Sequence, residues 1–221
     1  MTNETLEQKT AVIDAAIALY LSDAEYTVKN ICQRGKISQS ELYKLFGNQN
    51  RVLRQFYPNC VARYRENIAM MDDYDSMSLS EKLENFIFVM LDFFQEQRAF
   101  VEKTFAKMLA MRTAKAPFQN TVEDVFRTIL ENEKDVAFLQ RTFLLNFLTY
   151  DLLAGEFFSL VKFWLSDDSE HYEKTMAYAD KLINFLTEIL EVSIVDKGFD
   201  LAKFVVQHNL RHLPFYNRIF K

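Results

Sequence analysis

The chain has 221 residues, of which 49% are hydrophobic, and its net charge is −5 at pH 7. This length and composition allow a sizeable buried core and predict a folded globular protein. The negative charge argues against a protein coated with nucleic acid, because a general binder is broadly basic. Glycine and proline are scarce, and no segment alternates polar and apolar residues between turn signals. The sequence therefore predicts an all-α fold.

The two cysteines, Cys32 and Cys60, are too isolated for a disulfide framework or a metal site, which indicates a reducing compartment. The start of the chain lacks the pattern of a signal peptide, and no apolar run reaches the roughly 18 residues of a membrane helix. We therefore expect a cytoplasmic protein with no membrane partner.

Residues 6–21 carry Ile13, Ala16, Ile17 and Tyr20 at the i, i+3, i+4, i+7 spacing of an amphipathic helix. We expect this helix to turn these four side chains toward a core.

Two short helices follow, each with its own N-cap residue. Thr27 can cap the first and Ser38 the second. Their apolar faces consist of Val28, Ile31 and Cys32 in the first, and Leu42, Leu45 and Phe46 in the second. Helices this short are marginal alone, so both need the preceding helix to pack on. Three such helices predict a helix-turn-helix unit.

The stretch 27–53 resembles the DNA-binding domain of the TetR/AcrR family of bacterial repressors. The matching positions are Thr27-Val28, Ile37-Ser38, Leu42-Tyr43, Phe46-Gly47 and Leu53. The resemblance implies a three-helix helix-turn-helix domain at residues 1–48, followed by a helical ligand-binding and dimerisation domain at residues 49–221. The sequence departs from the family at Gly35 and Lys36, where Ala and Gly are usual, at Glu41, where Thr or Ser is usual, and at Gln49, which replaces a Lys.

Polar side chains on the outer face of the second short helix carry the DNA-binding hypothesis. Gln39 and Lys44 suit base readout in the major groove, because Gln pairs with adenine and Lys with guanine. The residues better placed for phosphate contacts are Thr27, Lys29, Lys36, Tyr43 and Gln49. The full set expected at the DNA is Thr27, Lys29, Lys36, Ser38, Gln39, Ser40, Tyr43, Lys44 and Gln49. Without the family resemblance, the same face would be interpreted as the solvated side of an ordinary helix. Glu41 is the main objection, since phosphates repel a carboxylate.

Residues 49–71 predict one longer helix that contains Pro58. A proline inside a helix kinks or splits it, so we expect a bend near Tyr57. A proline in a surface turn, with no functional bend, is an equal alternative.

Ser78 and Glu81 have the spacing of a capping box before an apolar helix at 79–94. Further helices are expected at about 100–112 and from Val122 to Leu130. Residues 113–120 contain Pro117 and predict a break between them.

Residues 135–165 form the longest apolar stretch, and it predicts a helix buried from two sides, by its own domain and by a partner. The polar segment 166–169 ends it, and a last long helix runs to about Val195. By resemblance, these two helices form a homodimer interface. The residues expected there are Phe157, Phe158, Val161, Leu165, Leu182, Phe185, Leu186 and Ile189. A C-terminal extension at 198–221 has no counterpart in the family pattern.

The chain contains 21 Phe and 8 Met residues, and many lie between 86 and 165. Such side chains line adaptable apolar cavities. A pocket for a small hydrophobic ligand would have as its walls Phe86, Met90, Phe94, Phe105, Met108, Phe126, Phe143, Phe147 and Tyr150. Close packing without a cavity explains the same residues equally well.

No catalytic or metal-binding constellation emerges. His208 and His212 are four residues apart but have no third ligand at a suitable spacing, so no metal and no other cofactor is expected. The sequence therefore predicts a non-enzymatic, ligand-responsive transcriptional regulator, a repressor that binds a palindromic double-stranded operator as a homodimer. The alternative is a TetR-fold protein that binds a hydrophobic ligand or lipid and no longer reads DNA.

Overall fold

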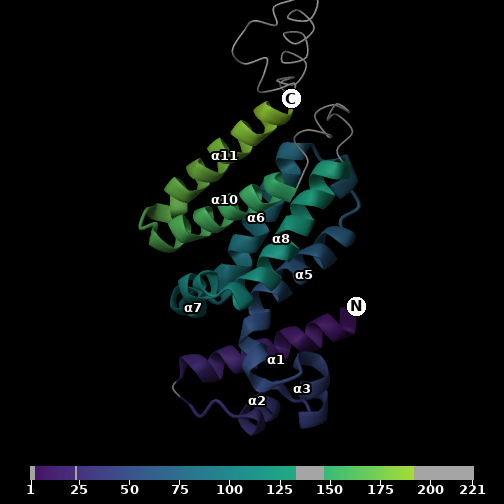
Figure 1. The fold of residues 1–221 in the computed structure, drawn as a ribbon, viewed down its shortest axis with the longest axis vertical. Helices are drawn as coiled ribbons and strands as arrows, with labels where there is room; N and C mark the ends of the chain where they lie inside the picture. The colour runs from purple at the N-terminus through teal and green to yellow at the C-terminus, as the bar shows by residue number, and fades with distance from the viewer. Residues whose placement is uncertain (1–2, 23, 133–146, 192–221) are drawn as a thin grey trace, which may run out of the picture.

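The computed structural model describes residues 3–22, 24–132 and 147–191, and within these ranges it contains helices and no strand. The elements are α1 (Asn3–Leu21), α2 (Val28–Gly35), α3 (Gln39–Phe46), α4 (Gln49–Val52), η1 (Leu53–Gln55), α5 (Phe56–Ala69), η2 (Tyr74–Ser76), α6 (Leu79–Glu96), α7 (Arg98–Ala110), α8 (Arg112–Asn132), α10 (Phe147–Ser166), η3 (Glu170–Tyr172) and α11 (Glu173–Glu191). Figure 1 shows α1, α2 and α3 at one end of the molecule, α10 and α11 toward the other, and α7 between them. The predicted all-α fold class is confirmed. The predicted domain boundary after residue 48 stays a prediction.

Helices α1 to α3 form the expected small core. Ile13 and Ile17 of α1 are buried with Ile31 of α2 and with Leu42 and Phe46 of α3. Both predicted caps are present, since the Thr27 side chain accepts from the backbone of α2 and the Ser38 side chain from that of α3. The chain therefore forms the helix-turn-helix unit that its pattern predicts.

At the edge of this unit, Tyr20 differs from expectation, and the structure explains why the chain has Gly35 where the family has Ala. Tyr20 is 36% exposed rather than part of the three-helix core, and its ring lies edge-on to Phe100 of α7, 5.7 Å between centroids. A Cβ on Gly35 would stand 3.3 Å from Val12 Cγ2. This close approach explains why the smallest residue occupies the end of α2.

The helix predicted at residues 49–71 is interrupted about one turn before Tyr57, where we expected a bend. Residues 49–71 do not form one helix, because η1 at Leu53–Gln55 separates α4 from α5. Pro58 lies in the first turn of α5, where a missing N–H would have had no helical partner. The proline therefore marks the start of a helix and not a bend inside it.

The capping box of α6 is confirmed: Glu81 accepts hydrogen bonds from the backbone N–H and the hydroxyl of Ser78, both at 2.7 Å. The predicted break at 113–120 is wrong, because α8 runs through Pro117. Proline has no N–H to donate to the carbonyl of Thr113, four residues earlier in the helix. Pro117 and Thr113 are both exposed, so water can replace that hydrogen bond.

Aromatic rings from α5, α6, α7, α8 and α10 form the larger core. The rings of Phe86 and Phe126 lie 5.2 Å apart and those of Phe118 and Phe158 5.1 Å apart, within the range of favourable aromatic pairs. Of the predicted helix at 135–165, the described part is α10, and it ends at Ser166 as expected. The extension at 198–221 and the pair His208 and His212 lie outside the described residues.

A buried carboxylate closes the turn between α10 and α11. Asp167 is 8% exposed and accepts four hydrogen bonds, from the backbone and hydroxyl groups of Ser169 and Thr175, at 2.6 to 2.9 Å. Burial alone would raise the pKa of Asp167, but these hydrogen bonds outweigh it and hold that pKa well below its usual value. These hydrogen bonds therefore fasten the start of α11 to the end of α10.

Candidate nucleic-acid interface

Helix α3 presents a polar face to solvent. Gln39, Ser40, Tyr43 and Lys44 are all exposed, and Tyr43 keeps 47% of its surface although it is a large aromatic residue. Leu42, on the opposite side of the helix, is fully buried. An exposed helix with hydrogen-bonding side chains and a buried apolar stripe is the form that enters a DNA major groove.

Glu41, whose negative charge was the main objection to DNA binding, has a structural role. Its carboxylate accepts from the backbone N–H and from the hydroxyl of Ser38, each at 2.7 Å, and Ser38 Oγ accepts from the Glu41 N–H at 3.2 Å. The backbone hydrogen bond, then the hydroxyl hydrogen bond and the nearby Lys44 charge, lower the pKa of Glu41. The carboxylate therefore belongs to the cap of α3 and is held at its N-terminus, where the helix dipole favours negative charge.

Three of the residues expected at phosphates lie in α2 or at its ends, before α3 in the chain. Lys29 is exposed on α2, and Thr27 caps that helix by accepting from the Asn30 N–H at 3.2 Å. Lys36 is exposed and ends α2 in the left-handed conformation, at φ 53°. A non-glycine residue in that conformation carries strain. Lys36 therefore lowers the stability of this turn relative to glycine, but it places a positive charge next to α3.

Gln49 is occupied within the protein. Its side-chain amide donates to the carbonyl of Tyr26, and the Tyr26 hydroxyl donates to the Gln49 carbonyl at 3.2 Å. Burial raises the pKa of Tyr26 to about 12. This pair fastens the segment before α2 to the start of α4, so the Gln49 side chain helps to position the unit, and its expected contact with a phosphate stays a prediction.

Sequence reasoning missed Arg51. It is exposed on α4, and a Cβ on Gly47 at the end of α3 would stand 3.4 Å from its Nη1 atom. The guanidinium therefore lies beside the C-terminus of α3, where an arginine can reach a phosphate. Its position after Gly47 and Asn48, in the turn that follows α3, is the signal that could have identified it.

The expected ligand residues lie in the aromatic core. Phe86, Met90, Phe94, Phe105, Met108, Phe126 and Tyr150 are all buried. Phe143 lies outside the described residues, and the Phe147 side chain is not described. Met108 also lines a cleft, defined here as the hinge cleft, of about 160 Å³ between α1, η1, α5, α7 and α8.

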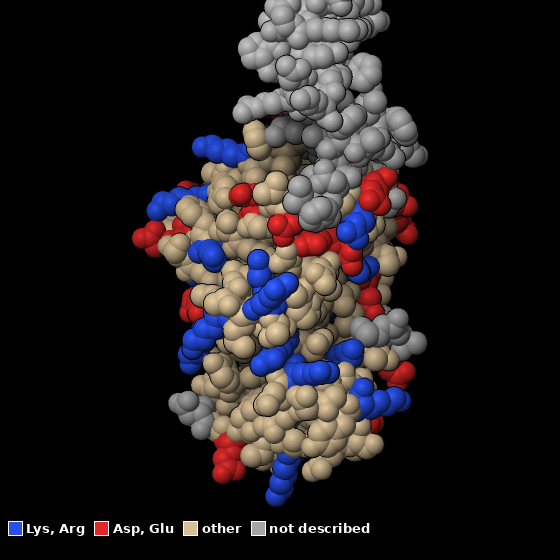
Figure 2. Space-filling view, in the orientation of Figure 1, with Lys and Arg blue, Asp and Glu red and all other residues tan. Residues whose placement is uncertain are grey.

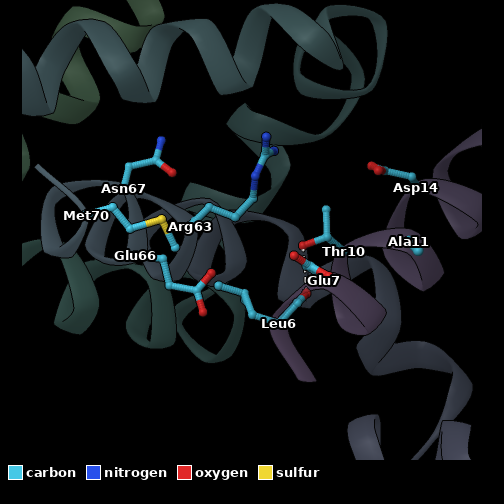
Figure 3. Close-up of a pocket in the computed structure, with 9 residues that line it drawn as sticks. All are labelled: Leu6, Glu7, Thr10, Ala11, Asp14, Arg63, Glu66, Asn67 and Met70. Atoms are coloured by element: carbon cyan, nitrogen blue, oxygen red, sulfur yellow. Dashed lines mark hydrogen bonds between the residues drawn. The ribbon is translucent and has the colours of Figure 1, made fainter. Parts of the chain in front are cut away.

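A second cleft, of about 430 Å³, separates α1 from α5. Figure 3 shows its wall, where Glu7 of α1 and Glu66 of α5 lie near Leu6, and Asp14 lies farther along α1. Arg63 forms a two-pronged ion pair with Glu96, at 2.9 and 3.3 Å. Asp14 accepts from the Gln97 side chain at 3.1 Å, and burial raises its pKa against the opposing effect of Arg63. The ion pair therefore ties α5 to α6, and the Asp14 contact ties α1 to the junction of α6 and α7.

The model of the tetracyclin repressor-like C-terminal domain family matches residues 82–205, more than half of the chain. The chain belongs to the TetR family. The solved TetR transcriptional regulator from Nitrosomonas europaea ATCC 19718 has a similar fold, with a TM-score of 0.59 and 16% identity, over 80% of this chain and 96% of that one. No curated protein sequence matches the chain.

The helices expected to pair TetR-family subunits are α10 and α11. Phe157, Phe158 and Val161 are at most 4% exposed within this chain, so they pack in its own core, and their expected contact with a partner stays a prediction. Leu165, Leu182 and Leu186 are half-buried, Phe185 is 59% exposed, and the Ile189 side chain is not described. Sequence reasoning missed three exposed apolar residues on these helices, Leu152, Phe163 and Met176.

Within the described residues, no helix of this TetR-family protein is long and apolar enough to cross a membrane. In the same part of the chain, no group of three or more His, Cys, Asp or Glu side chains is placed to hold a metal ion.

Proposed function

We propose that this TetR-family regulator is a ligand-responsive repressor that binds a palindromic operator as a homodimer. The observation that carries the proposal is α3, whose exposed face holds Gln39, Tyr43 and Lys44. Those side chains are open to solvent, while the one acidic residue on the same helix, Glu41, is engaged by Ser38.

Basic residues on both sides of α3 support the same proposal. Lys29, Lys36 and Arg51 are exposed, and residues 1–60 have a net charge of +1 in a chain of net charge −5. Phosphate contacts supply most of the affinity for DNA and fix the register of a recognition helix, while base-edge contacts supply specificity. We therefore assign base readout to Gln39 and Lys44, and phosphate contacts to the flanking residues.

Exposed apolar residues on α10 and α11 support the proposed dimer. Phe163 of α10 and Met176 and Phe185 of α11 expose apolar surface that a second subunit would cover. Two α3 helices related by a two-fold axis would enter successive major grooves about 34–36 Å apart. A hydrophobic ligand that favours another separation weakens operator binding, and by linkage the operator weakens ligand binding by the same factor.

The alternative of a ligand-binding protein that no longer reads DNA has lost two of its supports. Glu41 and Gln49 replace residues that favour DNA binding in the family, but each has a structural partner here. The small net charge of the first 60 residues is the support that remains.

The test is retardation of DNA from upstream of the protein's own gene at several salt concentrations. We expect specific binding that weakens with salt, and its loss in Lys44→Ala and in Tyr43→Ala with the dimer intact. Lys103→Ala is the matched control, because Lys103 is exposed on α7, away from α3. Specific binding that survives in both α3 variants would refute the proposal.

A further inference from the structure

The hinge cleft lies where the helix-turn-helix unit meets the larger helical part. Tyr20 of α1 and Leu53 and Arg54 of η1 line one side, and α7 and the start of α8 line the other. Met111, at the turn between α7 and α8, is 47% exposed at the edge of the cleft, which leaves the cleft accessible from solvent.

The inner wall of the hinge cleft is apolar, and its hydroxyl donors are used. It is made of Leu53, Tyr57, Phe100, Met108 and Ala114. Thr104 Oγ1 donates its single hydrogen to the Phe100 carbonyl at 2.7 Å, so Tyr57 must be the donor in the 2.8 Å contact between the Tyr57 and Thr104 hydroxyls. With both hydrogens engaged, the wall suits an apolar group better than a polar one.

The rim of the hinge cleft is basic. Arg54 and Lys107 line it, and neither forms an ion pair with any described residue. Residues 98–115 have a net charge of +4 although the whole chain has −5. Glu102, the only acid among them, is paired with Arg98 at 2.8 Å. Figure 2 shows Lys and Arg side chains gathered across the middle of one face, at the height of α7 in Figure 1.

We propose that the hinge cleft binds a small organic carboxylate, with its tail against the apolar wall and its head between Arg54 and Lys107. The volume of about 160 Å³ limits the tail. At about 30 Å³ for a water-sized group, the cleft holds roughly five such groups. A six-carbon carboxylate meets this limit, because its five tail carbons fill the cleft and its carboxylate lies at the rim. A cationic head group on the same tail would be repelled by the two rim charges.

Such a ligand would touch both parts of the regulator. It bridges α1 and η1, which carry the helix-turn-helix unit, to α7 and α8. A ligand shifts an equilibrium only by its difference in affinity for the two states. A cleft at the contact between two parts would change shape if the angle between those parts changed. This regulatory consequence rests on the proposed function, whereas binding itself does not.

The test compares three probes with the same six-carbon chain, namely hexanoate, 1-hexanol and hexylamine, by isothermal titration of the full-length protein. We expect hexanoate to bind best and hexylamine worst. Because an exposed ion pair is worth at most about a fivefold change in affinity, Lys107→Ala and Arg54→Ala should each weaken hexanoate binding roughly threefold to fivefold. Lys103→Ala, one turn away on α7 and outside the cleft, should change it less than about twofold.

Charge reversal gives the sharpest outcome. In Lys107→Glu, hexanoate should lose its advantage and hexylamine should gain, while the exposed position of Lys107 keeps the fold intact. Equal binding of the three probes, or equal losses in Lys107→Ala and Lys103→Ala, would overturn the proposed site. If hexanoate binds as expected but no operator DNA is retarded, the site stands and the proposed function fails. If the operator is retarded but hexanoate does not bind, the reverse holds.

Discussion

The cap of α3 can be tested by removing one oxygen atom. In Ser38→Ala, the Glu41 N–H loses its acceptor at 3.2 Å, and the Glu41 carboxylate loses one of its two donors. The remaining contact is the Ser38 backbone N–H, at 2.7 Å from the carboxylate. The first turn of α3, which carries Gln39 and Ser40, would then be held less firmly.

The expected cost is about 1 kcal/mol, the typical value for replacing a serine N-cap by alanine. For a chain of this size, that corresponds to a fall of about 2–4 °C in Tm. If the frayed turn must reform on the operator, the same energy reappears as a roughly fivefold loss of DNA affinity, because about 1.4 kcal/mol corresponds to a tenfold change.

A second capping box in the same chain provides the matched control. Ser78 and Glu81 at the start of α6 make the same hydrogen bonds, at 2.7, 2.7 and 3.3 Å, outside the helix-turn-helix unit. Ser78→Ala should lower Tm by a similar amount and leave DNA affinity unchanged. Thermal unfolding and fluorescence anisotropy with labelled operator measure the two effects. Equal losses of affinity in both variants, or none in Ser38→Ala, would refute the reasoning.

Three further predictions follow from single residues. Lys36→Gly should raise thermal stability, because it relieves the left-handed strain at φ 53°, yet weaken operator binding and reduce its salt slope by about 1; an unchanged slope would exclude a phosphate contact. Phe185 is exposed and Phe157 is buried, so Phe185→Asp should dissociate the dimer in sedimentation experiments with little loss of monomer stability, whereas Phe157→Ala should cost about 3–5 kcal/mol of stability. A dimer that survives Phe185→Asp would place the interface elsewhere. Asp167 has a lowered pKa, so its contribution to stability is present above the unfolded pKa of about 3.9 and is lost as the pH falls toward the folded value; Asp167→Asn should therefore lower Tm at pH 7 and flatten its fall in acid, and an unchanged acid profile would contradict this.

Features that depend on neighbouring residues were predictable. The caps of Thr27, Ser38 and Ser78 need only a side-chain oxygen and a helix that starts at once, so the sequence indicates both position and mechanism. The buried stripe of Leu42 and Phe46 follows from helical spacing in the same way.

Features that depend on distant partners were not predictable. Gln49 resembles a substituted phosphate contact until its amide is seen on the Tyr26 carbonyl, 23 positions earlier. Pro117 signals a break, but burial of the following Phe118 and Val122 keeps α8 continuous. Helix α10 is apolar on several sides, so spacing alone could not decide which phenylalanines face the core and which face solvent.

If a ligand regulates DNA binding as proposed, the contacts of α1 limit how its signal travels. Helix α3 packs mainly on α2 and α4, whereas α1 contacts α5, η1 and α7 directly. Specific contacts hold α1 in that place: Asn59 donates to Thr10 Oγ1 at 2.8 Å, and Gln97 donates to Asp14 at 3.1 Å. A change in α7 therefore acts on α1 first, and α3 follows because α1 and α3 share one core. A change in η1 reaches both α1 and α4, and α4 packs on α3. The recognition helix should move as part of a rigid three-helix unit, so ligands would change its position relative to a partner's α3 and leave its own capping box intact.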